Sequence, residues 1–435
     1  MRYYLAVAAA VALFGAPWIA LNYPEHIDML NSAFNRASLN VAAVITHNPR
    51  TVAELQAKYN GKPWFAATTS ATSTPAEPKV HILIVPGHEP NFGGAEFSLG
   101  SGGRLRERDM AVALAQNLQT FVKNNPRYEV SVTRDDVAWT PDFSDYFKDN
   151  WNDIIDWQKS SHEEVRHLIA IGSTTAPTST VFHNTAPTNV ALRLYGITKW
   201  ANEHTVDIVI HIHFNDYPDH RVSVAGKHSG LAIYVPTYQF SNSSTTRVIA
   251  ETIFQRLAKY NPVSNLPGES SGIIDEPELI AIGANNTSDA ASMLIEYGYI
   301  YEPQFTNPQT RDLALKDLAF QTYLGLQDFF DPVSAITLSR PYDTLILPHE
   351  WKKGMTAENA VPTDVYALQT ALQIEGIYPP TGSEKNDCPR SGTIGACTRK
   401  ALDVFQQKYG ISGEKGVVGS KTLNALNSKY GLSTI

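Results

Sequence analysis

Between residues 80 and 332, short apolar runs alternate with longer stretches of helical periodicity. The apolar runs have the length and the β-branched content of buried strands, and the stretches between them place apolar residues three or four positions apart. Strands that alternate with helices predict an α/β fold, in which a twisted, mostly parallel sheet is flanked by helices. We expect strands at 80–85, 128–134, 206–213, 230–235 and 292–300, and helices at 106–124, 246–260 and 311–330.

Length and composition exclude several other classes of protein. At about 150 residues per domain, the 435 residues allow two or three domains. Hydrophobic residues make up 43% and charged residues 18%, so the chain is neither disordered nor fibrous. The net charge of −8 gives no general attraction to nucleic acid, which we therefore exclude as a partner. The 2 cysteines cannot form a Cys₄ zinc site or a disulfide-dense scaffold.

Residues 1–22 have the composition of an export signal or a membrane anchor. Residues 3–21 carry no charged side chain and follow Arg2. This run approaches the length of about 20 residues that spans a bilayer, and no clear small-residue cleavage pattern follows it. We therefore favour an uncleaved anchor over a cleaved signal peptide. Either interpretation exports the rest of the chain to the periplasmic or extracellular side of the cell envelope, with membrane contact through this segment only.

The remaining chain divides into four parts by composition. Residues 23–79 predict a membrane-proximal segment that ends in a linker of small and polar residues, and 333–360 predict a second, Pro-rich linker. Between them lies the α/β domain, 80–332, in which 135–190 predicts an insertion, either a lid over the site or a surface elaboration. Residues 361–435 predict a small three-helix domain, with helices at 364–376, 397–410 and 419–430.

Three polar residues lie where predicted strands and helices of the α/β domain begin or end. His88 follows the first strand, Glu107 begins the first helix, and His213 ends the strand at 206–213. In an open α/β sheet, the site crevice forms at the carboxyl ends of the strands. Two imidazoles and one carboxylate are a ligand set that zinc uses when a fourth position stays open for water. These three residues are therefore candidate metal ligands.

A fourth polar residue, Glu296, lies inside the apolar strand predicted at 292–300. An ionised carboxylate without a partner costs several kcal/mol in such surroundings. Burial near a cation makes an acid of this kind useful as a base. The alternative interpretation is a structural carboxylate that is satisfied by a buried arginine or by backbone N–H groups.

The sequences around these residues resemble the zinc-dependent N-acetylmuramoyl-L-alanine amidases of the Amidase_3 type, which are bacterial cell-wall hydrolases. The matching stretches span about residues 80–332 and keep the order of the family: VPGH, a glutamate at a helix start, VTRDD, DIVIHIHFN and LIEYGY. The resemblance implies that His88, Glu107 and His213 bind Zn²⁺ and that Glu296 is the catalytic acid and base. It also implies cleavage of the amide between N-acetylmuramic acid and L-alanine in peptidoglycan.

The sequence departs from the pattern of the family at three points. Glu89-Pro90 stands where the family has Gly-Gly, and Tyr297-Gly298-Tyr299 stands where it has Gly-Phe after the glutamate. His211 replaces a serine two residues before His213. On a regular strand the two imidazoles point to the same face. We expect His211 to pack beside the site, and the alternative is that it competes as a metal ligand.

The C-terminal segment is similar to peptidoglycan-binding domains of the PG_binding_1 type. The matching elements are Leu368-Gln369, Phe405-Gln406 and Gly416-Val417-Val418-Gly419, and they cover about residues 361–431. Ser391 and Lys415 stand where the family has an aspartate before each glycine turn. The resemblance implies peptidoglycan as a partner. The alternative is a helical spacer with the same packing.

The two cysteines, Cys388 and Cys397, flank the first glycine turn of this segment. In an exported protein we expect them to form a disulfide, and the alternative is two free thiols. Two other functions remain open for the whole chain. One is a zinc peptidase that cuts within the stem peptide, and the other is an anchored peptidoglycan-binding protein without activity.

Overall fold

The computed structural model describes most of the chain after residue 48. No helix in the described residues is long and apolar enough to cross a membrane. The anchor predicted at 1–22 lies outside the described residues. The described ranges are 49–61, 77–100, 102–176, 178–179, 181, 185–217, 221–283, 288–332 and 341–432.

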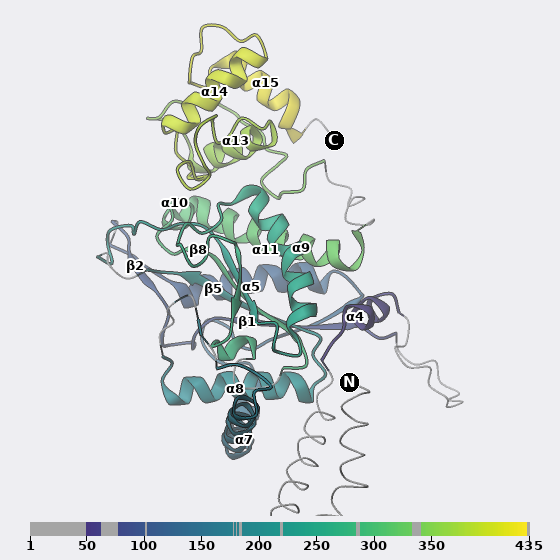
Figure 1. Cartoon of the computed structure of the whole chain (residues 1–435). Helices are drawn as coiled ribbons and strands as arrows, with labels where there is room; N and C mark the ends of the chain where they lie inside the picture. Colours follow the sequence, from purple (N-terminus) through teal and green to yellow (C-terminus); the bar gives the residue numbers. More distant parts are fainter. Residues whose placement is uncertain are drawn as a thin grey trace, which may run out of the picture. The chain divides into compact units, whose positions relative to one another are not determined.

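A six-stranded sheet lies at the centre of the α/β domain (Figure 1). Its strand order is β4-β1-β5-β8-β6-β7, and all neighbours are parallel except β8 and β6, which are antiparallel. The predicted mostly parallel sheet is confirmed, with one short strand, β7, added at its edge. The strands are β1 (Val80–Pro86), β4 (Tyr128–Val132), β5 (Ile208–Asn215), β6 (Ala232–Pro236), β7 (Ile273–Glu276) and β8 (Ala291–Tyr299), and a separate hairpin pairs β2 (Glu96–Ser98) with β3 (Arg104–Arg106).

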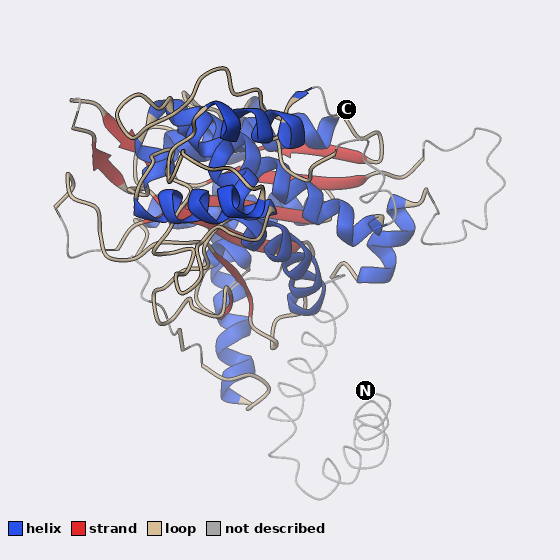
Figure 2. Ribbon diagram, turned by 90° about the horizontal axis from the view of Figure 1, so that it is seen from above, coloured by secondary structure: helices blue, strands red, loops and turns tan. Residues whose placement is uncertain are grey.

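Helices cover both faces of this sheet (Figure 2). Strands buried on both faces read as continuous apolar runs, which is why 80–85 and 206–213 were recognisable. Consecutive residues of a strand, such as Val209 and Ile210, therefore belong to different hydrophobic clusters on opposite faces of the sheet. One face packs against α5 (Glu107–Lys123), α9 (Ser243–Tyr260) and α11 (Pro308–Phe330), and the other against α6 (Pro141–Asp149) and α8 (Thr188–Glu203).

The segment predicted as an insertion contributes to the second of these faces. It contains α6, α7 (Trp151–Ala170) and the first residues of α8. Phe143 and Ile154 are fully buried and belong to the same hydrophobic cluster as Leu83 of β1. The Phe143 and Trp200 rings lie 4.6 Å apart between centroids. Part of this segment is therefore core of the domain rather than decoration of its surface.

A short helix before the sheet, α4 (Val52–Tyr59), is fastened to the amino ends of β1 and β5. Thr51 caps it in a capping box with Glu54. Lys58 and Arg50 pair with the buried carboxylate of Asp207, which directly precedes β5. Breaking these ion pairs would be destabilising, because the Asp207 carboxylate would then be buried without a counter-charge.

The C-terminal domain contains the three predicted helices, which are drawn in yellow-green in Figure 1. They are α13 (Pro362–Ile374), α14 (Ala396–Lys408) and α15 (Ser420–Tyr430). The described part of the predicted second linker, 341–360, packs against them. The Trp351 side chain is 1% exposed, and its backbone N–H donates to Asn427 Oδ1 at 2.9 Å. The two shortest helices of the described residues are η3 (Ile280–Ile282) and α10 (Pro303–Thr306).

The two Gln residues of the peptidoglycan-binding pattern occupy equivalent places in this domain. Gln369 on α13 accepts from Gly392 N at 3.0 Å and donates to Thr398 Oγ1 at 3.0 Å. Gln406 on α14 accepts from Gly416 N at 3.1 Å and donates to Thr422 Oγ1 at 2.9 Å. Each glutamine thus connects a glycine turn to the start of the next helix, and this explains the spacing of the repeated motif.

At the two glycine turns, Ser391 and Glu414 accept the backbone hydrogen bonds for which the family pattern would supply an aspartate. Ser391 Oγ accepts from Thr393 N at 3.2 Å, a serine version of the turn that an aspartate would make. In the second repeat, Glu414 accepts from Lys421 N and Thr422 N at 2.9 Å each, at the first turn of α15. The glycine turns are therefore closed in both repeats despite the substitutions.

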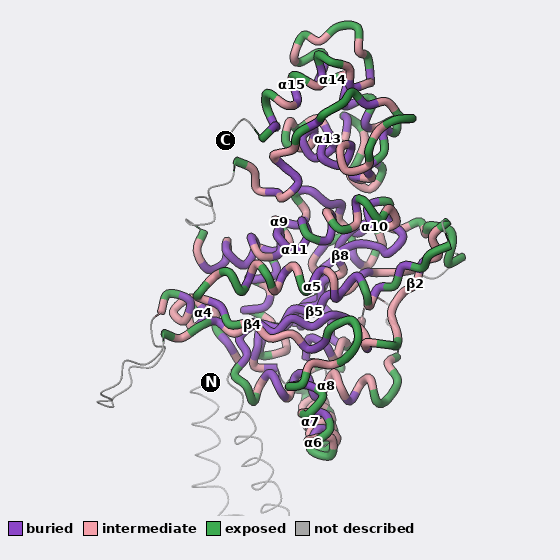
Figure 3. The backbone as a smooth tube through the Cα atoms, turned by 180° about the vertical axis from the view of Figure 1, so that it is seen from behind, coloured by how far each residue is buried: buried purple, intermediate pink, exposed green. Residues whose placement is uncertain are grey.

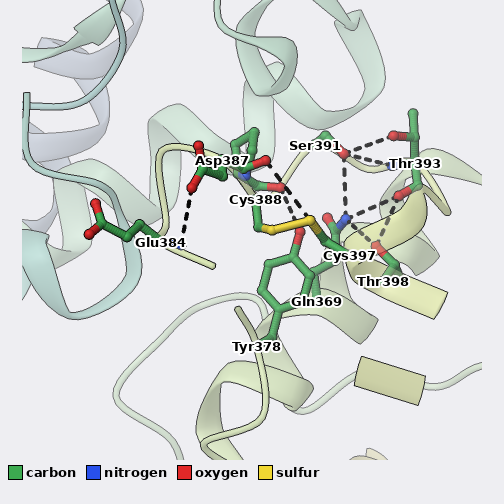
Figure 4. Close-up of a disulfide and its surroundings, with 10 residues drawn as sticks. Gln369, Tyr378, Glu384, Asp387, Cys388, Ser391, Thr393, Cys397 and Thr398 are labelled. Carbon is green, nitrogen blue, oxygen red and sulfur yellow. Dashed lines mark hydrogen bonds between the residues drawn. A yellow bond between two sulfur atoms is a disulfide. The ribbon is translucent and has the colours of Figure 1, made fainter. Parts of the chain in front are cut away.

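A disulfide joins Cys388 and Cys397 across the first glycine turn (Figure 4). Cys388 is buried, and Cys397 lies in the first turn of α14. Figure 4 shows Tyr378 beside this bridge, where its hydroxyl donates to the Pro389 carbonyl at 2.8 Å. The bridge therefore holds the segment before the turn against the helix that follows it.

The same segment contacts the α/β domain, and Pro49–Ile435 form one compact unit. Arg390 is buried and donates to Asn261 Oδ1 at 3.0 Å, while its Nη1 lies 3.6 Å from Asp317 Oδ2 on α11. Asn386 donates to the Ser229 carbonyl at 3.1 Å. Buried residues continue from the sheet into this contact, as the purple segments of Figure 3 show.

Candidate active site

The candidate site lies at the carboxyl ends of three neighbouring strands, β1, β5 and β8. His88 follows β1, Glu107 is the first residue of α5, and His213 lies near the end of β5. His213 pairs in register with Glu296 of β8. Because partners in register on neighbouring parallel strands point to the same face, the two side chains leave the sheet on the same side.

The structure brings the three candidate ligands together. One ligand atom from each of His88, Glu107 and His213 lies within 4.8 Å of the others. The carboxylate is central, because Glu107 Oε1 is 2.8 Å from His88 Nε2 and 2.9 Å from His213 Nδ1. The two imidazole rings meet edge to face at 4.9 Å between centroids.

Glycines make room for this cluster. A Cβ on Gly87 would lie 2.5 Å from His213 Cε1, closer than real side chains approach. A Cβ on Gly94, whose φ is +85°, would lie 2.9 Å from His88 Cδ2. His88 itself has a positive φ of 68°, an uncommon conformation for a residue with a side chain. The VPGH turn therefore folds tightly against the ring of the second histidine.

Backbone amides fix the carboxylate of Glu107. Its Oε2 accepts from Ala95 N at 2.7 Å, and its Oε1 accepts from Phe214 N at 3.2 Å. Burial alone would raise its pKa, but the charge of the neighbouring His88 and the hydrogen bond from His213 hold the pKa of Glu107 well below its usual value. Burial lowers the pKa of His213. These shifts favour an ionised Glu107 carboxylate and a neutral His213 imidazole, the protonation states in which such side chains bind a metal.

Glu296 is the least satisfied acid of the site. Its Oε2 atom is buried and has no hydrogen-bond partner among the described residues. Burial, followed by the charges of Glu107 and Glu269, raises the pKa of Glu296 well above its usual value. This oxygen therefore lacks the arginine or backbone N–H that the structural interpretation of Glu296 requires.

His211 packs beside the site and is not part of the ligand cluster found in the described residues. Its side chain is 2% exposed, and it hydrogen-bonds to the backbone of Ala281 in η3. Burial, followed by the neighbouring His213, lowers the pKa of His211 to about 3. A neutral imidazole is therefore held in the wall of the site.

Sequence reasoning missed the roles of residues around the first ligand. Glu89 accepts from Arg193 Nη1 of α8 at 3.0 Å, which accounts for an acid where the family has glycine. Arg134 is buried under the VPGH turn and hydrogen-bonds to its carbonyl groups. The signal for Arg134 was present in the VTRDD motif, as a charged residue at the end of the alternating strand predicted at 128–134.

The donor set fits a zinc ion that keeps an open coordination position. Two imidazole nitrogens and a carboxylate oxygen converge, and His88 Nε2 is buried without a hydrogen bond although it approaches Glu107. The second unpartnered buried atom is Glu296 Oε2. A cation bound between the histidines would give both atoms a favourable neighbour.

Two segments of the chain match family models. Residues 171–327 match the N-acetylmuramoyl-L-alanine amidase family, and residues 362–426 match the putative peptidoglycan binding domain family. The first match includes His213 and Glu296 but begins after His88 and Glu107. None of the curated proteins compared with the chain is significantly similar to it.

Several solved structures of amidases are similar to the chain at low sequence identity. An N-acetylmuramoyl-L-alanine amidase from Clostridium difficile 630 has 16% identity and a TM-score of 0.36, over 59% of this chain and 98% of that one. The catalytic domain of an amidase from Bacillus (Paenibacillus) polymyxa has 17% identity and a TM-score of 0.33, over 58% and 97%. An amidase from Mycobacterium abscessus has 14% identity and a TM-score of 0.35, over 58% and 99%.

Proposed function

Because residues 171–327 match the N-acetylmuramoyl-L-alanine amidase family, we propose that the chain hydrolyses the amide between N-acetylmuramic acid and L-alanine of peptidoglycan with a zinc ion. The observation that carries the zinc part of this proposal is the convergence of His88, Glu107 and His213 within 4.8 Å. Glu296 lies in register beside His213, where an acid and base is needed.

The residues of the chain divide the work as follows. His88, Glu107 and His213 would hold the ion through two imidazole nitrogens and a carboxylate oxygen. A zinc ion bound in such a site lowers the pKa of a water molecule to about 7 and polarises a carbonyl group. Glu296 accepts the proton of the attacking water on its carboxylate and delivers it to the nitrogen of the leaving L-alanine. Beside such a cation, Glu296 would be held in its ionised, proton-accepting form.

The C-terminal domain supplies the second contact with the substrate in this proposal. Residues 362–426 match a putative peptidoglycan binding domain, and the domain is attached to the α/β domain through buried contacts. Attachment to the wall raises the concentration of substrate near the site. Peptidoglycan lies outside the cytoplasm, so we place the working enzyme in the cell envelope, with residues 3–21 as its membrane anchor.

Digestion of purified peptidoglycan by the full chain in the presence of Zn²⁺ tests the proposal. Amidase action releases intact stem peptides with a new L-alanine amino group and leaves lactyl carboxyl groups on the glycan. Cleavage inside the stem would instead indicate a peptidase, and the absence of any product would indicate a binding protein. Either result contradicts the proposal.

The variant Glu296→Gln tests the acid and base. It should lower the rate of release by about 10²–10⁴-fold, the usual contribution of general acid–base catalysis, and leave Zn²⁺ binding intact. The control is Glu251→Gln, which changes an exposed glutamate of α9 and should be fully active. Near-normal activity of Glu296→Gln would remove this residue from the mechanism.

A further inference from the structure

Arg134 is a buried cation next to the candidate ligands, and it hydrogen-bonds almost entirely to backbone carbonyl groups. Its side chain is 1% exposed. Its Nε donates to the His88 carbonyl at 2.8 Å and to the Pro86 carbonyl at 3.3 Å. Its Nη2 donates to the Gly87 carbonyl between them. Three consecutive carbonyls of the VPGH turn therefore converge on one guanidinium group.

The same side chain also reaches the segment that carries the second ligand. Nη2 donates to the carbonyl of Arg108 at 3.1 Å, and Arg108 directly follows Glu107 in the first turn of α5. Nη1 donates to the Asp135 carbonyl at 3.0 Å. One planar, rigid fork thus ties the His88 turn to the amino end of the helix that carries the carboxylate ligand.

The turn needs such support because of its conformation. His88 has a φ of +68°, a conformation that is unfavourable for a residue with a side chain. Such a conformation persists only where surrounding contacts stabilise it. The carbonyls of Pro86, Gly87 and His88 also point inward, where each would be costly without a donor. Among the described residues no carboxylate forms an ion pair with Arg134, so its charge is balanced by carbonyl dipoles and by more distant acids such as Glu89.

We infer that Arg134 is a positioning residue for the metal site: it holds the turn of His88 and the start of α5 in the arrangement that brings their ligand atoms together. This inference rests on the proposed zinc site. It assigns Arg134 no contact with substrate. Its effect passes through the main chain of residues 86–88, because the guanidinium holds carbonyl oxygens rather than the imidazole.

The test is the Zn²⁺ affinity of Arg134→Lys in the full chain, measured by competition with a chromophoric chelator. Lysine keeps the charge but offers a single flexible ammonium in place of the fork. Loss of support around a metal ligand weakens metal binding by about 10–100-fold, and we expect a loss of this size. The d–d absorption of the Co²⁺-loaded variant should change as well, because it reports the arrangement of the ligands.

The matched control is Arg311→Lys. Arg311 also donates from Nε to a backbone carbonyl, that of Phe305 at 2.6 Å, but it lies on α11 away from the ligands. The Arg311→Lys variant should have a lower melting temperature than the wild type and the same Zn²⁺ affinity. A folded Arg134→Lys protein with wild-type Zn²⁺ affinity and Co²⁺ spectrum would overturn the inference.

A second variant, Arg134→Gln, keeps one amide donor and removes the charge, so it should bind Zn²⁺ more weakly than the wild type as well. If neither Arg134 variant folds while Arg311→Lys does, the inference also fails, because Arg134 would then support the fold rather than the ligand turn. A wild-type chain that binds no Zn²⁺ would instead refute the proposed metal site itself. The two failures are therefore distinguishable.

Discussion

At the scale of single residues, Gly87 decides whether His213 can reach the other two candidate ligands. A Cβ at position 87 would lie 2.5 Å from Cε1 and 2.7 Å from Nδ1 of the His213 ring. We expect Gly87→Ala to push the ring away and to weaken Zn²⁺ binding by about 10–100-fold, as for other disturbances of a ligand's support. The measurement is a Zn²⁺ titration of the full chain.

The control for this variant is Gly395→Ala, because a Cβ at Gly395 meets nothing within 4 Å. Gly395 also has a negative φ of −86°, which alanine adopts without strain. Gly395→Ala should bind Zn²⁺ as the wild type does. Equal affinities of the two variants would mean that the His213 ring can move aside at no cost.

His81 makes the stability of the fold dependent on pH. Burial, the largest effect, lowers the pKa of His81 from its usual value of 6.5. The unfolded chain then binds a proton more readily than the folded one, so the fold loses stability as the pH falls below about 6.5. One such group contributes at most about 1.4 kcal/mol per pH unit, and less here because the ring is partly exposed.

Urea unfolding of the wild type and of His81→Gln at pH 7.5 and 5.5 checks this expectation. The wild type should lose more free energy of unfolding between the two pH values than the variant does. Glutamine can keep a contact to Ser131 Oγ, which the His81 ring approaches at 2.9 Å. An identical loss in both proteins would assign the acid sensitivity to other groups.

At the scale of helices and strands, the sequence was informative where burial imposes a period. The run at 206–213 is apolar because β5 is buried on both faces, and it was recognisable for that reason. The pairing of His213 with Glu296 depends on the register between β5 and β8, which only the folded sheet sets. The strand at 230–235 was predicted, but its antiparallel direction as β6 and the short strand β7 were equally beyond local pattern.

The helix α6 shows a second limit of local pattern. Its sequence is rich in acids and aromatic residues, and it interrupts the alternation of strands and helices. Its buried face became evident only against β1, where Phe143 meets the cluster that includes Leu83. The VTRDD motif contains Arg134, but its contacts were similarly hidden, because its partners are carbonyl groups that no side-chain motif encodes.

Removal of the Phe143 ring tests whether α6 is a true layer of the core. Phe143 is 0% exposed, and truncation of a buried phenylalanine to alanine costs about 3–5 kcal/mol. We expect Phe143→Ala to lose free energy of unfolding in this range by urea denaturation. Val137→Ala, at a side chain that is 77% exposed in the same segment, should change it by less than about 0.5 kcal/mol. Similar values for both would make the segment a surface addition.

At the scale of the whole molecule, Arg390 couples the C-terminal domain to the α/β domain. The central carbon of its guanidinium lies 4.9 Å from the ring centroid of Tyr366, which belongs to the same domain as Arg390. It lies 5.3 Å from the ring centroid of Tyr260, the last residue of α9 in the α/β domain. Asp317 Oδ2 has no hydrogen bond and lies 3.6 Å from Arg390 Nη1. Arg390→Ala would leave this buried carboxylate without its cation, at a cost of about 3–5 kcal/mol.

A double-mutant cycle with Asp317→Asn measures this coupling. The aspartate variant removes the uncompensated charge, so the double variant should be less destabilised than the sum of the two single variants. Urea unfolding of the full chain gives the four free energies. Strict additivity would show that the two side chains do not interact and that other contacts hold the domains together.

The attachment of α4 has a practical consequence for handling the molecule. Lys58 and Arg50 form ion pairs with Asp207 at the amino end of β5, whereas His213 lies near the carboxyl end of that strand. At about 3.3 Å per strand residue, roughly 20 Å of sheet separates the two. A bead or a fluorescent carrier coupled at position 49 would therefore lie at the amino ends of the strands. The candidate site at their carboxyl ends would stay accessible to long polymers.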